Sequence, residues 1–435
     1  MRRRRPSERG REAVARTGAE SGSPEATRLH IVVLTTLAEL GGAERSLLEL
    51  VRRLTPELRF TLVLPEDGPL ASVACEAGAS VELVRWPRVL SGLGERARRR
   101  IGPVALVRAA ASAPGVLAAL GRTIRRLEPD AVVTNGIKAH VLGALVRRSS
   151  GTPLVWYARE GLEDRPRSRA LLRLAAARCD GAIAISRYVA SEFRPLVPPR
   201  APIHVVPNIV DLERFRPGLR AAADLAKAPD EIRFGVVGAL TPLKGQDLFL
   251  DAAARVVREV PRARFVIVGG SPYRTEAGLG FEAALLEQAR TLGIEPQVSF
   301  LGAREDVASV MAGLDVLVQP NRGPEGLGRS ILEAMASAVP VVVVDRWGPR
   351  ELVRDGETGL LVPPLDVPAL AERMVTLARN PALRARLGRA GRAWVTAEHD
   401  PDRLAARCRD ALVEMIGAGA PRRGPGVKEM ALSGR

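Results

Sequence analysis

The sequence predicts an α/β protein with two doubly wound domains, each built on a parallel sheet covered by helices on both faces. Three observations support this prediction. Short apolar runs of strand length alternate with helical stretches along most of the chain. The alternation is interrupted at residues 212–231, where there is little apolar periodicity. The chain has 435 residues, which is long enough for two domains that each form a core of their own.

Seven strand-like runs lie in the first half of the chain. The first, LHIVVLTT at residues 29–36, is followed by the pair Gly41-Gly42 and then by a stretch whose apolar residues recur at helical spacing. Helical stretches also separate most of the other runs, and this predicts parallel strands joined by crossover helices. The remaining runs are at residues 60–65, 81–86, 131–135, 153–158, 181–186 and 203–208.

The second half repeats this rhythm with six runs, at residues 232–238, 263–270, 298–302, 314–320, 339–344 and 359–364. Ligands of such sheets bind beyond the C-terminal ends of the strands, so two facing domains predict a cleft between them. The predicted boundaries are a disordered basic tail at 1–27, an N-terminal Rossmann-like domain at 28–214, a linker at 215–230, a C-terminal Rossmann-like domain at 231–400, a last helix at 401–417 and a flexible tail at 418–435.

The composition is ordinary for a soluble globular protein, with 46% apolar and 26% charged residues. The three cysteines, Cys75, Cys179 and Cys408, share no close spacing, so neither a disulfide framework nor a zinc site is predicted. The arginines at residues 2–5 are not followed by an apolar segment, and we expect neither a signal peptide nor a membrane-spanning helix. A cytoplasmic location is therefore expected.

The net charge of +16 permits two interpretations. Only four of the 65 basic residues are lysines, so the charge reflects either a compositional bias or attraction to an anionic surface. The basic segment 90–126 is compatible with peripheral binding to the inner face of the plasma membrane, and equally with an ordinary helix pair that covers the sheet. Nucleic-acid binding is not expected, because three tyrosines and few other aromatic residues leave little for base stacking.

The stretch QPNRGPEGLGRSILEAMASAVPVVVV at residues 319–344 carries the clearest site. It predicts a loop, a short helix that begins near Arg329 and a buried strand. Glu325 lies in the loop and Glu333 one turn into the helix, with a glycine-rich helix start between them. The free N–H groups of that start favour a phosphate group, and the carboxylates can accept hydrogen bonds from hydroxyls. A nucleotide sugar offers both groups, whereas two solvated glutamates are the plain alternative.

Two other turns that follow strands contain glycine. Gly41-Gly42 either allow a close backbone approach to a ligand or form a simple turn. Gly238 ends a strand of the second half, and Lys244 follows at a helix start, where an ammonium group can neutralise a phosphate.

Taken together, these motifs resemble the family-4 retaining glycosyltransferases, which have the GT-B fold. The most specific match runs from FLGAREDVASVMAGLDVLVQP at 300–320 into EGLGRSILEAMASAVPVVVVDRWGPRELVRDGETGLLVPPLD at 325–366. Weaker matches in the family's order are GGAE (41–44), NGIKAH (135–140), VVPNIVDLERFRP (205–217) and VVGALTPLKG (236–245). The resemblance implies an N-terminal domain that binds the acceptor and a C-terminal domain that binds the nucleotide sugar.

The resemblance also implies roles for single residues. Glu333 is expected to bind the ribose of the donor and Glu325 the transferred sugar, while Lys244 and the backbone of the loop hold the diphosphate and stabilise the leaving group. The residues expected to be catalytic are Glu325, His140 and Lys244; those expected to bind the donor are Gly42, Gly238, Lys244, Arg304, Glu325, Gly326, Leu327, Gly328 and Glu333; those expected on the acceptor side are Asn135, Lys138, His140 and Arg159.

Three positions depart from the family pattern. Ala239 stands where an arginine commonly supplies a second cation for the diphosphate, so Arg304 or Arg329 would have to compensate. The family often has a histidine close to the transferred sugar, where this chain has Tyr157, Ala158 and Arg159. Leu327 replaces an aromatic residue of the loop, a mild change because the expected phosphate contact is made by the backbone.

The activity that the resemblance implies is sugar transfer from a nucleotide-sugar donor to an acceptor hydroxyl with retention, through same-face attack assisted by the leaving phosphate. The expected acceptor is a glycan or lipid-linked molecule, such as a cell-surface glycan precursor, and no metal or other cofactor is expected. Two alternatives remain open. One is another enzyme of the GT-B fold, such as an epimerase or a phosphorylase, and the other is a nucleotide-sugar-binding protein without transferase activity.

Overall fold

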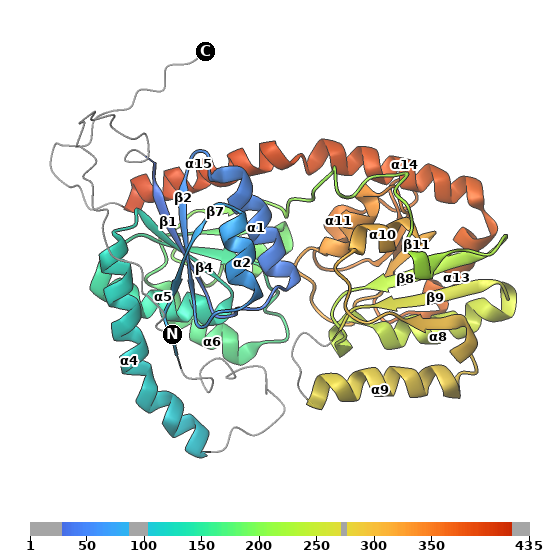
Figure 1. The fold of residues 1–435 in the computed structure, drawn as a ribbon, viewed down its shortest axis with the longest axis horizontal. Helices are drawn as coiled ribbons and strands as arrows, with labels where there is room; N and C mark the ends of the chain where they lie inside the picture. The colour runs from blue at the N-terminus through green and yellow to red at the C-terminus, as the bar shows by residue number, and fades with distance from the viewer. Residues whose placement is uncertain (1–27, 87–102, 271–275, 420–435) are drawn as a thin grey trace, which may run out of the picture.

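The computed structural model describes residues 28–86, 103–270 and 276–419. Two parallel sheets with helices on both faces form two domains, which lie side by side along the long axis of the molecule (Figure 1). Each of the thirteen strand-like runs of the sequence corresponds to one strand, so the predicted α/β fold class is confirmed. The tail predicted at 1–27, and all but the first two residues of the tail predicted at 418–435, lie outside the described residues.

The N-terminal sheet has the strand order β3-β2-β1-β4-β5-β6-β7, with every pair parallel. Its central strands β1 (His30–Thr35) and β4 (Ala131–Asn135) are buried along their whole length, as expected for strands covered on both faces. The strand order reverses between β1 and β4, which leaves a crevice beyond their C-terminal ends. The other strands are β2 (Arg59–Leu64), β3 (Ser80–Leu83), β5 (Leu154–Ala158), β6 (Gly181–Ala184) and β7 (Ile203–Val205).

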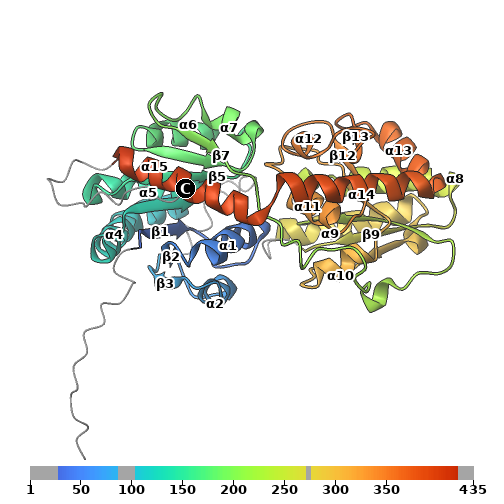
Figure 2. The ribbon, with the colours of Figure 1, turned by 90° about the horizontal axis from the view of Figure 1, so that it is seen from above.

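Helices cover both faces of this sheet because the chain first adds strands on one side of β1 and then on the other. With right-handed crossovers, these two directions place the connecting helices on opposite faces. The connections from β1 toward β3 place α1 (Gly42–Leu54) and α2 (Pro69–Glu76) on one face, and Figure 2 shows α4 and α5 on the opposite side of β1. The helices of that second face are α4 (Pro103–Leu127), α5 (Ile137–Ser150), α6 (Pro166–Ala176) and α7 (Arg187–Phe193).

The C-terminal sheet has the order β10-β9-β8-β11-β12-β13 and repeats this architecture. Its strands are β8 (Ile232–Val237), β9 (Ala263–Val268), β10 (Val298–Phe300), β11 (Val316–Gln319), β12 (Val341–Val344) and β13 (Leu360–Val362). Its α-helices are α8 (Gln246–Glu259), α9 (Glu276–Thr291), α10 (Val307–Ala312), α11 (Arg329–Ala336), α12 (Pro349–Leu352), α13 (Val367–Arg379) and α14 (Pro381–Glu398). Short 3-10 helices lie at η2 (Ala223–Leu225), η3 (Pro242–Lys244) and η4 (Glu295–Gln297).

The chain crosses between the domains twice. The segment predicted as a linker is packed rather than loose, because Phe215 and Leu225 are both buried within it. Arg392 on α14 donates to the carbonyl oxygens of Leu212 and Phe215, at 3.5 and 2.7 Å. The last helix, α15 (Pro401–Gly419), returns to the N-terminal domain and packs against α1, so α14 and α15 run along both halves of the molecule (Figures 1 and 2).

The basic segment predicted at 90–126 is only partly described, since residues 90–102 lie outside the described ranges. Its described part belongs to α4, a helix with Pro114 inside it. Among the helices of the described ranges, none has both the length and the apolar character needed to cross a bilayer.

Candidate active site between the two domains

The loop before α11 forms the centre of the candidate site. β11 ends at Gln319, and Gly328 immediately before α11 has φ +101°, a left-handed conformation that favours glycine. No side-chain cap is found for this helix among the described residues, so its first N–H groups and the positive end of its dipole are left for another acceptor. The predicted helix start near Arg329 is therefore found where the sequence placed it.

Glu325 in this loop is paired with Lys244, which ends the 3-10 helix that follows β8. Asn321 also donates its side-chain amide to Glu325, at 3.4 Å. The two charged side chains are largely buried, with 27% of Lys244 and 17% of Glu325 exposed. The connections that follow β8 and β11 thus bring the predicted phosphate-binding cation and the predicted sugar-binding carboxylate into contact, although the two residues are 81 positions apart in the sequence.

Glu333 is paired with a second cation. It is buried on α11, and its carboxylate accepts a hydrogen bond from Nε of Arg329 at 2.7 Å. Arg329 also reaches across to the N-terminal domain, where it donates to the carbonyl oxygen of Gly42 at 3.4 Å. Both carboxylates of the Glu-x7-Glu motif therefore have an internal cation in this structure.

The loop of the C-terminal domain touches the N-terminal domain at Gly326. The hydroxyl of Ser186, at the start of α7, donates to the carbonyl oxygen of Gly326 at 2.6 Å. A Cβ atom at position 326 would overlap the carbonyl oxygen of Arg159, and one at Gly348 would overlap the backbone of Gly326 and Leu327. Glycine is needed at 326 because the backbones of the two domains pack against each other there, and at 348 because the loop packs against its own domain.

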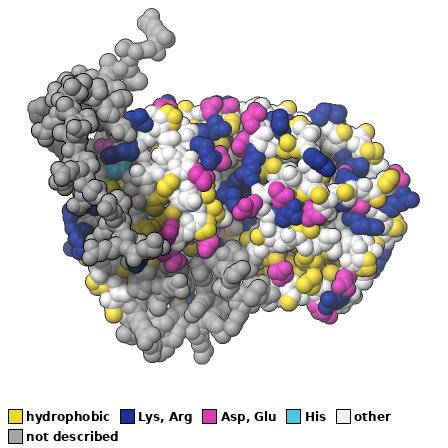
Figure 3. Space-filling view, viewed as in Figure 1, with side chains coloured by type: hydrophobic (Ala, Val, Ile, Leu, Met, Phe, Trp, Pro, Cys, Tyr) yellow, Lys and Arg dark blue, Asp and Glu magenta, His cyan; other side chains and the backbone are white. Residues whose placement is uncertain are grey.

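Two carboxylates strengthen this domain contact. Glu351 on α12 accepts hydrogen bonds from the backbone N–H groups of Arg187 and Tyr188, at 3.0 and 2.6 Å. In the opposite direction, Glu163 of the N-terminal domain accepts from Arg346 at 2.5 Å and from the indole N–H of Trp347 at 2.6 Å. Figure 3 shows side chains of both charges gathered on the surface where the two domains meet.

A cation that the sequence did not single out lies beside Glu333. Arg45, on α1 next to the GGAE motif, has its pKa lowered by burial and by the neighbouring charges of Arg329 and Arg214. The carboxylate of Glu333 acts in the opposite direction on that pKa. Positive charge thus converges on this part of the cleft from both domains, an arrangement that favours an anionic ligand.

The predicted acceptor-side residues divide into two groups. Asn135 and Arg159 lie at the C-terminal ends of neighbouring strands and are buried, at 5% and 8% exposure. Within the described residues, Oδ1 of Asn135 and both Nε and one terminal nitrogen of Arg159 have no hydrogen-bond partner, although Arg159 donates to Asn208 at 3.2 Å. These polar groups at the crevice of the N-terminal sheet have hydrogen-bonding capacity left for a ligand. Lys138 lies half-buried in the first turn of α5.

His140 lies elsewhere. It is 1% exposed, its ring stacks on Trp156 with centroids 5.0 Å apart, and the ring of Phe193 meets it edge-on. Its Nδ1 is 2.7 Å from the hydroxyl of Thr134, and burial lowers its pKa to about 3. In this structure His140 is therefore a neutral residue of the core, and it does not line the cleft as its expected catalytic and acceptor-side roles require.

The other expected donor residues have different surroundings. Arg304 pairs with Asp306 and Asp224, whose hydrogen bonds raise its pKa, so it has two carboxylate partners where Lys244 and Arg329 each have one, and its expected contact with the diphosphate stays a prediction. A Cβ atom at Gly42 would meet nothing within 4 Å, so the space beside this backbone is open, and its expected contact with the donor phosphate stays a prediction. Gly238 has φ +157°, and its carbonyl oxygen packs against Gly269, so the turn after β8 does depend on glycine.

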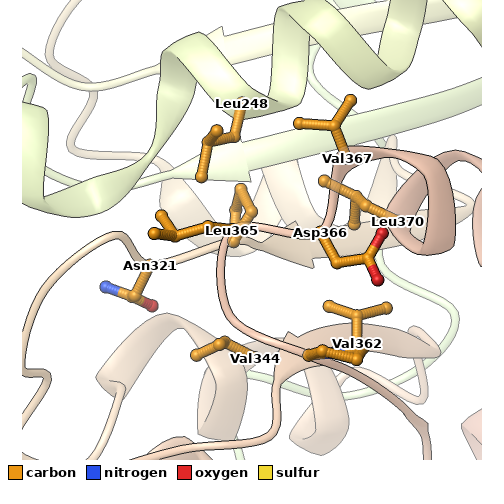
Figure 4. Close-up of a pocket in the computed structure, with 10 residues that line it drawn as sticks. Leu248, Asn321, Val344, Val362, Leu365, Asp366, Val367 and Leu370 are labelled. Atoms are coloured by element: carbon orange, nitrogen blue, oxygen red, sulfur yellow. The ribbon is translucent and has the colours of Figure 1, made fainter.

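Neither a cavity of the C-terminal domain nor a metal cluster adds to the site. The cavity in Figure 4, lined by Asn321, Val344 and Leu370 among others, has a volume of about 10 Å³, room for no more than a water molecule. Among the described residues no group of three His, Cys, Asp or Glu is placed to hold a metal ion. The sequence contains an Asp-x-Asp triplet, a pattern that can bind metal ions, at residues 400–402. It lies at the start of α15, where Asp400 accepts a hydrogen bond from the N–H of Arg403 at 2.7 Å.

Known proteins resemble both halves of the chain. Residues 40–214 match the family described as Glycosyltransferase Family 4, and residues 231–380 match Glycosyl transferases group 1. A GDP-mannose-dependent alpha-(1-6)-phosphatidylinositol monomannoside mannosyltransferase of Mycolicibacterium smegmatis is 33% identical over 273 residues, 58% of this chain and 68% of the relative. The chain belongs to the group 1 glycosyltransferases of family 4.

Other members of this family align over shorter parts. The protein of the same name from Mycobacterium tuberculosis is 34% identical over 261 residues, which are 57% of this chain and 65% of the relative. A D-inositol 3-phosphate glycosyltransferase of Nocardia farcinica is 38% identical over 229 residues, which are 50% of this chain and 49% of the relative. The chain thus spans about two thirds of the first relative's length and about half of the second's.

Solved structures of other proteins share the whole architecture. HepE from Anabaena, in complex with UDP and glucose, has a TM-score of 0.75 and 23% identity, covering 89% of this chain and 100% of its own. Sucrose-phosphate synthase from Thermosynechococcus elongatus has a TM-score of 0.74 and 20% identity, covering 90% and 100%. With two facing Rossmann-like domains, the chain has the GT-B fold.

Proposed function

We propose that this protein is a retaining glycosyltransferase that moves a sugar from a nucleotide-sugar donor to an acceptor hydroxyl. The observation that carries this proposal is the arrangement around α11. Glu325 and Glu333 lie on either side of an uncapped helix N-terminus, and each is held by a cation, Lys244 or Arg329, that a diphosphate can recruit. Family membership supports this assignment.

Donor binding exchanges ion pairs in this proposal. The diphosphate accepts hydrogen bonds from the first N–H groups of α11 and from Lys244 and Arg329, because two phosphate groups attract both cations more strongly than one carboxylate each. Glu333 then becomes free to accept hydrogen bonds from the ribose, and Glu325 from the hydroxyls of the sugar. Arg45 adds positive charge from the N-terminal domain, and in this proposal it compensates for Ala239 of the C-terminal domain, which stands where the family commonly has a second diphosphate cation.

The transfer step needs no carboxylate nucleophile. The acceptor oxygen forms a bond to the anomeric carbon on the face from which the bond to the phosphate oxygen breaks. The proton of the acceptor hydroxyl passes to the leaving phosphate oxygen. Lys244 and the N-terminus of α11 stabilise the negative charge that builds up on the diphosphate, so these fixed charges take the role for which a divalent metal is often used. We therefore propose a metal-independent reaction.

The relatives narrow the choice of substrates. Names of the mycobacterial relatives specify GDP-mannose and a phosphatidylinositol monomannoside, the Nocardia relative's name specifies D-inositol 3-phosphate, and HepE was solved with UDP-glucose. We propose a GDP- or UDP-linked hexose as donor. The proposed acceptor is a hydroxyl of a lipid-linked molecule or cell-surface glycan precursor, which the unpaired groups of Asn135 and Arg159 are placed to bind.

A thermal-shift series followed by a transfer assay tests this proposal. GDP-mannose and UDP-glucose are added to the full chain with and without EDTA, and the donor that raises the unfolding temperature is then incubated with phosphatidylinositol or inositol phosphate. We expect nucleotide release with one donor, unaffected by EDTA and lost in Lys244→Met. Donor binding without nucleotide release in any mixture would favour the non-catalytic alternative, and product formed without an acceptor would favour an epimerase.

A further inference from the structure

Three neighbouring helices on one face of the N-terminal domain contain no acidic residue, whereas α7 on the same face contains Glu192. The helices α4, α5 and α6 contain four, three and three Lys or Arg residues and no Asp or Glu. They lie next to one another, because α5 packs against both α4 and α6. On the opposite face, α1 contains Glu44 and Glu49, and α15 contains Asp402, Asp410 and Glu414. A compositional excess of arginine does not explain why acidic residues are missing from these three adjacent helices and present in α1 and α15.

On the outside of this face Arg126 of α4 pairs with Glu82 at 2.8 Å, but three other exposed arginines have no acidic partner among the described residues. Arg148 on α5 and Arg167 and Arg173 on α6 are exposed, and none has a side-chain partner among the described residues. Elsewhere exposed arginines often have a carboxylate partner, as Arg409 has in Glu57 at 2.6 Å. The positive charge of the face is therefore available to an external anionic partner.

Large apolar side chains lie among these arginines. Leu171 and Leu174, one turn apart on α6, are 54% and 76% exposed, and Leu145 on α5 is 48% exposed. A leucine that remains exposed in the folded protein gains free energy when a partner removes it from water. Exposed leucines beside unpaired arginines on a helix surface are the combination that binds the boundary between lipid head groups and acyl chains.

From this combination we infer that the α4–α6 face, defined here as the outer surface of α4, α5 and α6, docks on an anionic lipid bilayer. The arginines contact the head-group phosphates, and Leu171 and Leu174 insert between the acyl chains. The leucines favour lipid over nucleic acid, which would require base-stacking aromatic residues that this face does not offer among its exposed side chains in the described residues. The inference concerns a surface separate from the donor site, so it stands or falls independently of the proposed activity.

Sedimentation of the full chain with vesicles tests the inference. Vesicles of phosphatidylcholine alone are compared with vesicles that also contain phosphatidylglycerol. The test variant is R173E/L174E, at two exposed positions of α6. The matched control is R389E/V413E, which makes the same change of charge on α14 and α15, where Arg389 and Val413 are also exposed. Thermal unfolding with and without the donor nucleotide sugar shows whether each variant is folded and keeps its donor site.

We expect binding to the anionic vesicles that weakens with salt, and at least about a tenfold lower partition for R173E/L174E, since each basic residue near an anionic surface contributes several-fold. The control should bind like the wild type. Equal losses in both variants would mean that net charge rather than this face drives binding, which overturns the inference. It is also overturned if the wild type ignores the anionic vesicles, or if it binds RNA in a shift assay but not lipid.

Discussion

Replacement of Glu333 by alanine is the sharpest test of how the donor is held. In the unliganded site the Glu333 carboxylate pairs with Arg329 at 2.7 Å, and only 9% of its side chain is exposed. The proposed role of Glu333 is to accept hydrogen bonds from the ribose after the diphosphate has drawn Arg329 away. The substitution therefore removes a contact that is made equally in the ground state and in the transition state, since the ribose takes no part in the reaction.

The size of the effect follows from these contacts. A hydrogen bond to a charged group contributes about 1.5–3 kcal/mol, which corresponds to roughly 10- to 150-fold in affinity. The variant also leaves Arg329 without a carboxylate, and the side chain of Arg329 is 18% exposed. The freed guanidinium can pair with the diphosphate from the start, which offsets part of the loss. We therefore expect the donor KM to rise about 10- to 50-fold, the lower part of that range.

Steady-state kinetics with a varied donor and a saturating acceptor measure this effect, and calorimetric titration with the free nucleoside diphosphate separates binding from turnover. The expected kcat stays within about threefold of the wild-type value. Glu259→Ala is the control, because Glu259 pairs with Arg379 at 3.0 Å at the far end of α8 and should leave both constants unchanged. An unchanged donor KM, or a kcat that falls while KM stays constant, would refute the assignment of Glu333 to the ribose.

Three other substitutions test separate parts of the structure. Glu325→Ala should lower kcat at least about tenfold with a smaller change in donor KM, because contacts to the transferred sugar strengthen as it reacts; a change confined to KM in the same kinetic assay would contradict this role. Gly326→Ala should lower kcat/KM about tenfold or more without lowering the unfolding temperature of either domain, since the new Cβ overlaps the Arg159 carbonyl and separates the domains; small-angle scattering that shows an unchanged closed form would argue against it. Burial lowers the pKa of His140 to about 3 in the folded chain. As the pH falls, His140 is therefore protonated in the unfolded chain before it is protonated in the folded chain. This difference should lower the free energy of unfolding by about 2 kcal/mol between pH 7 and pH 5. In denaturant titrations His140→Gln should remove about this much of the pH dependence, and an unaltered pH dependence would show that His140 is not responsible.

The strands were predictable because their signal is local. The run VVVV in β12 has no polar residue, so it fits a strand that is buried on both faces. A buried helix would need a longer apolar segment than the sequence offers here. The packing of distant segments was not predictable. Phe215 and Leu225 are isolated apolar residues in a polar stretch, and nothing local shows that both become buried against other elements. For the same reason the last helix was expected from its pattern, but its return to α1 was not.

The same distinction applies to the positions of the residues expected in the site. The loop with Glu325 and the helix with Glu333 lie within one short segment, so their relation follows from the spacing in the sequence. The fate of His140 depends on Trp156 and Phe193, which come from two other elements, and that of Arg304 on Asp224, 80 residues away. Arg45 had a local signal, because it follows the GGAE motif directly, and this position at the start of α1 could have placed it in the cleft.

The distribution of charge explains why the site needs both domains. In the C-terminal domain Lys244 and Arg329 are neutralised by Glu325 and Glu333, so this half alone presents little net charge to a diphosphate. Arg45 adds a cation from the N-terminal domain that burial and like charges destabilise, as its lowered pKa indicates. An anionic donor relieves this repulsion only while the two domains are in contact. Domain closure therefore increases the affinity for the donor, and by thermodynamic linkage donor binding stabilises the closed form by the same free energy. We therefore propose that Arg45 takes the place of the cation absent at Ala239 and couples donor binding to domain closure.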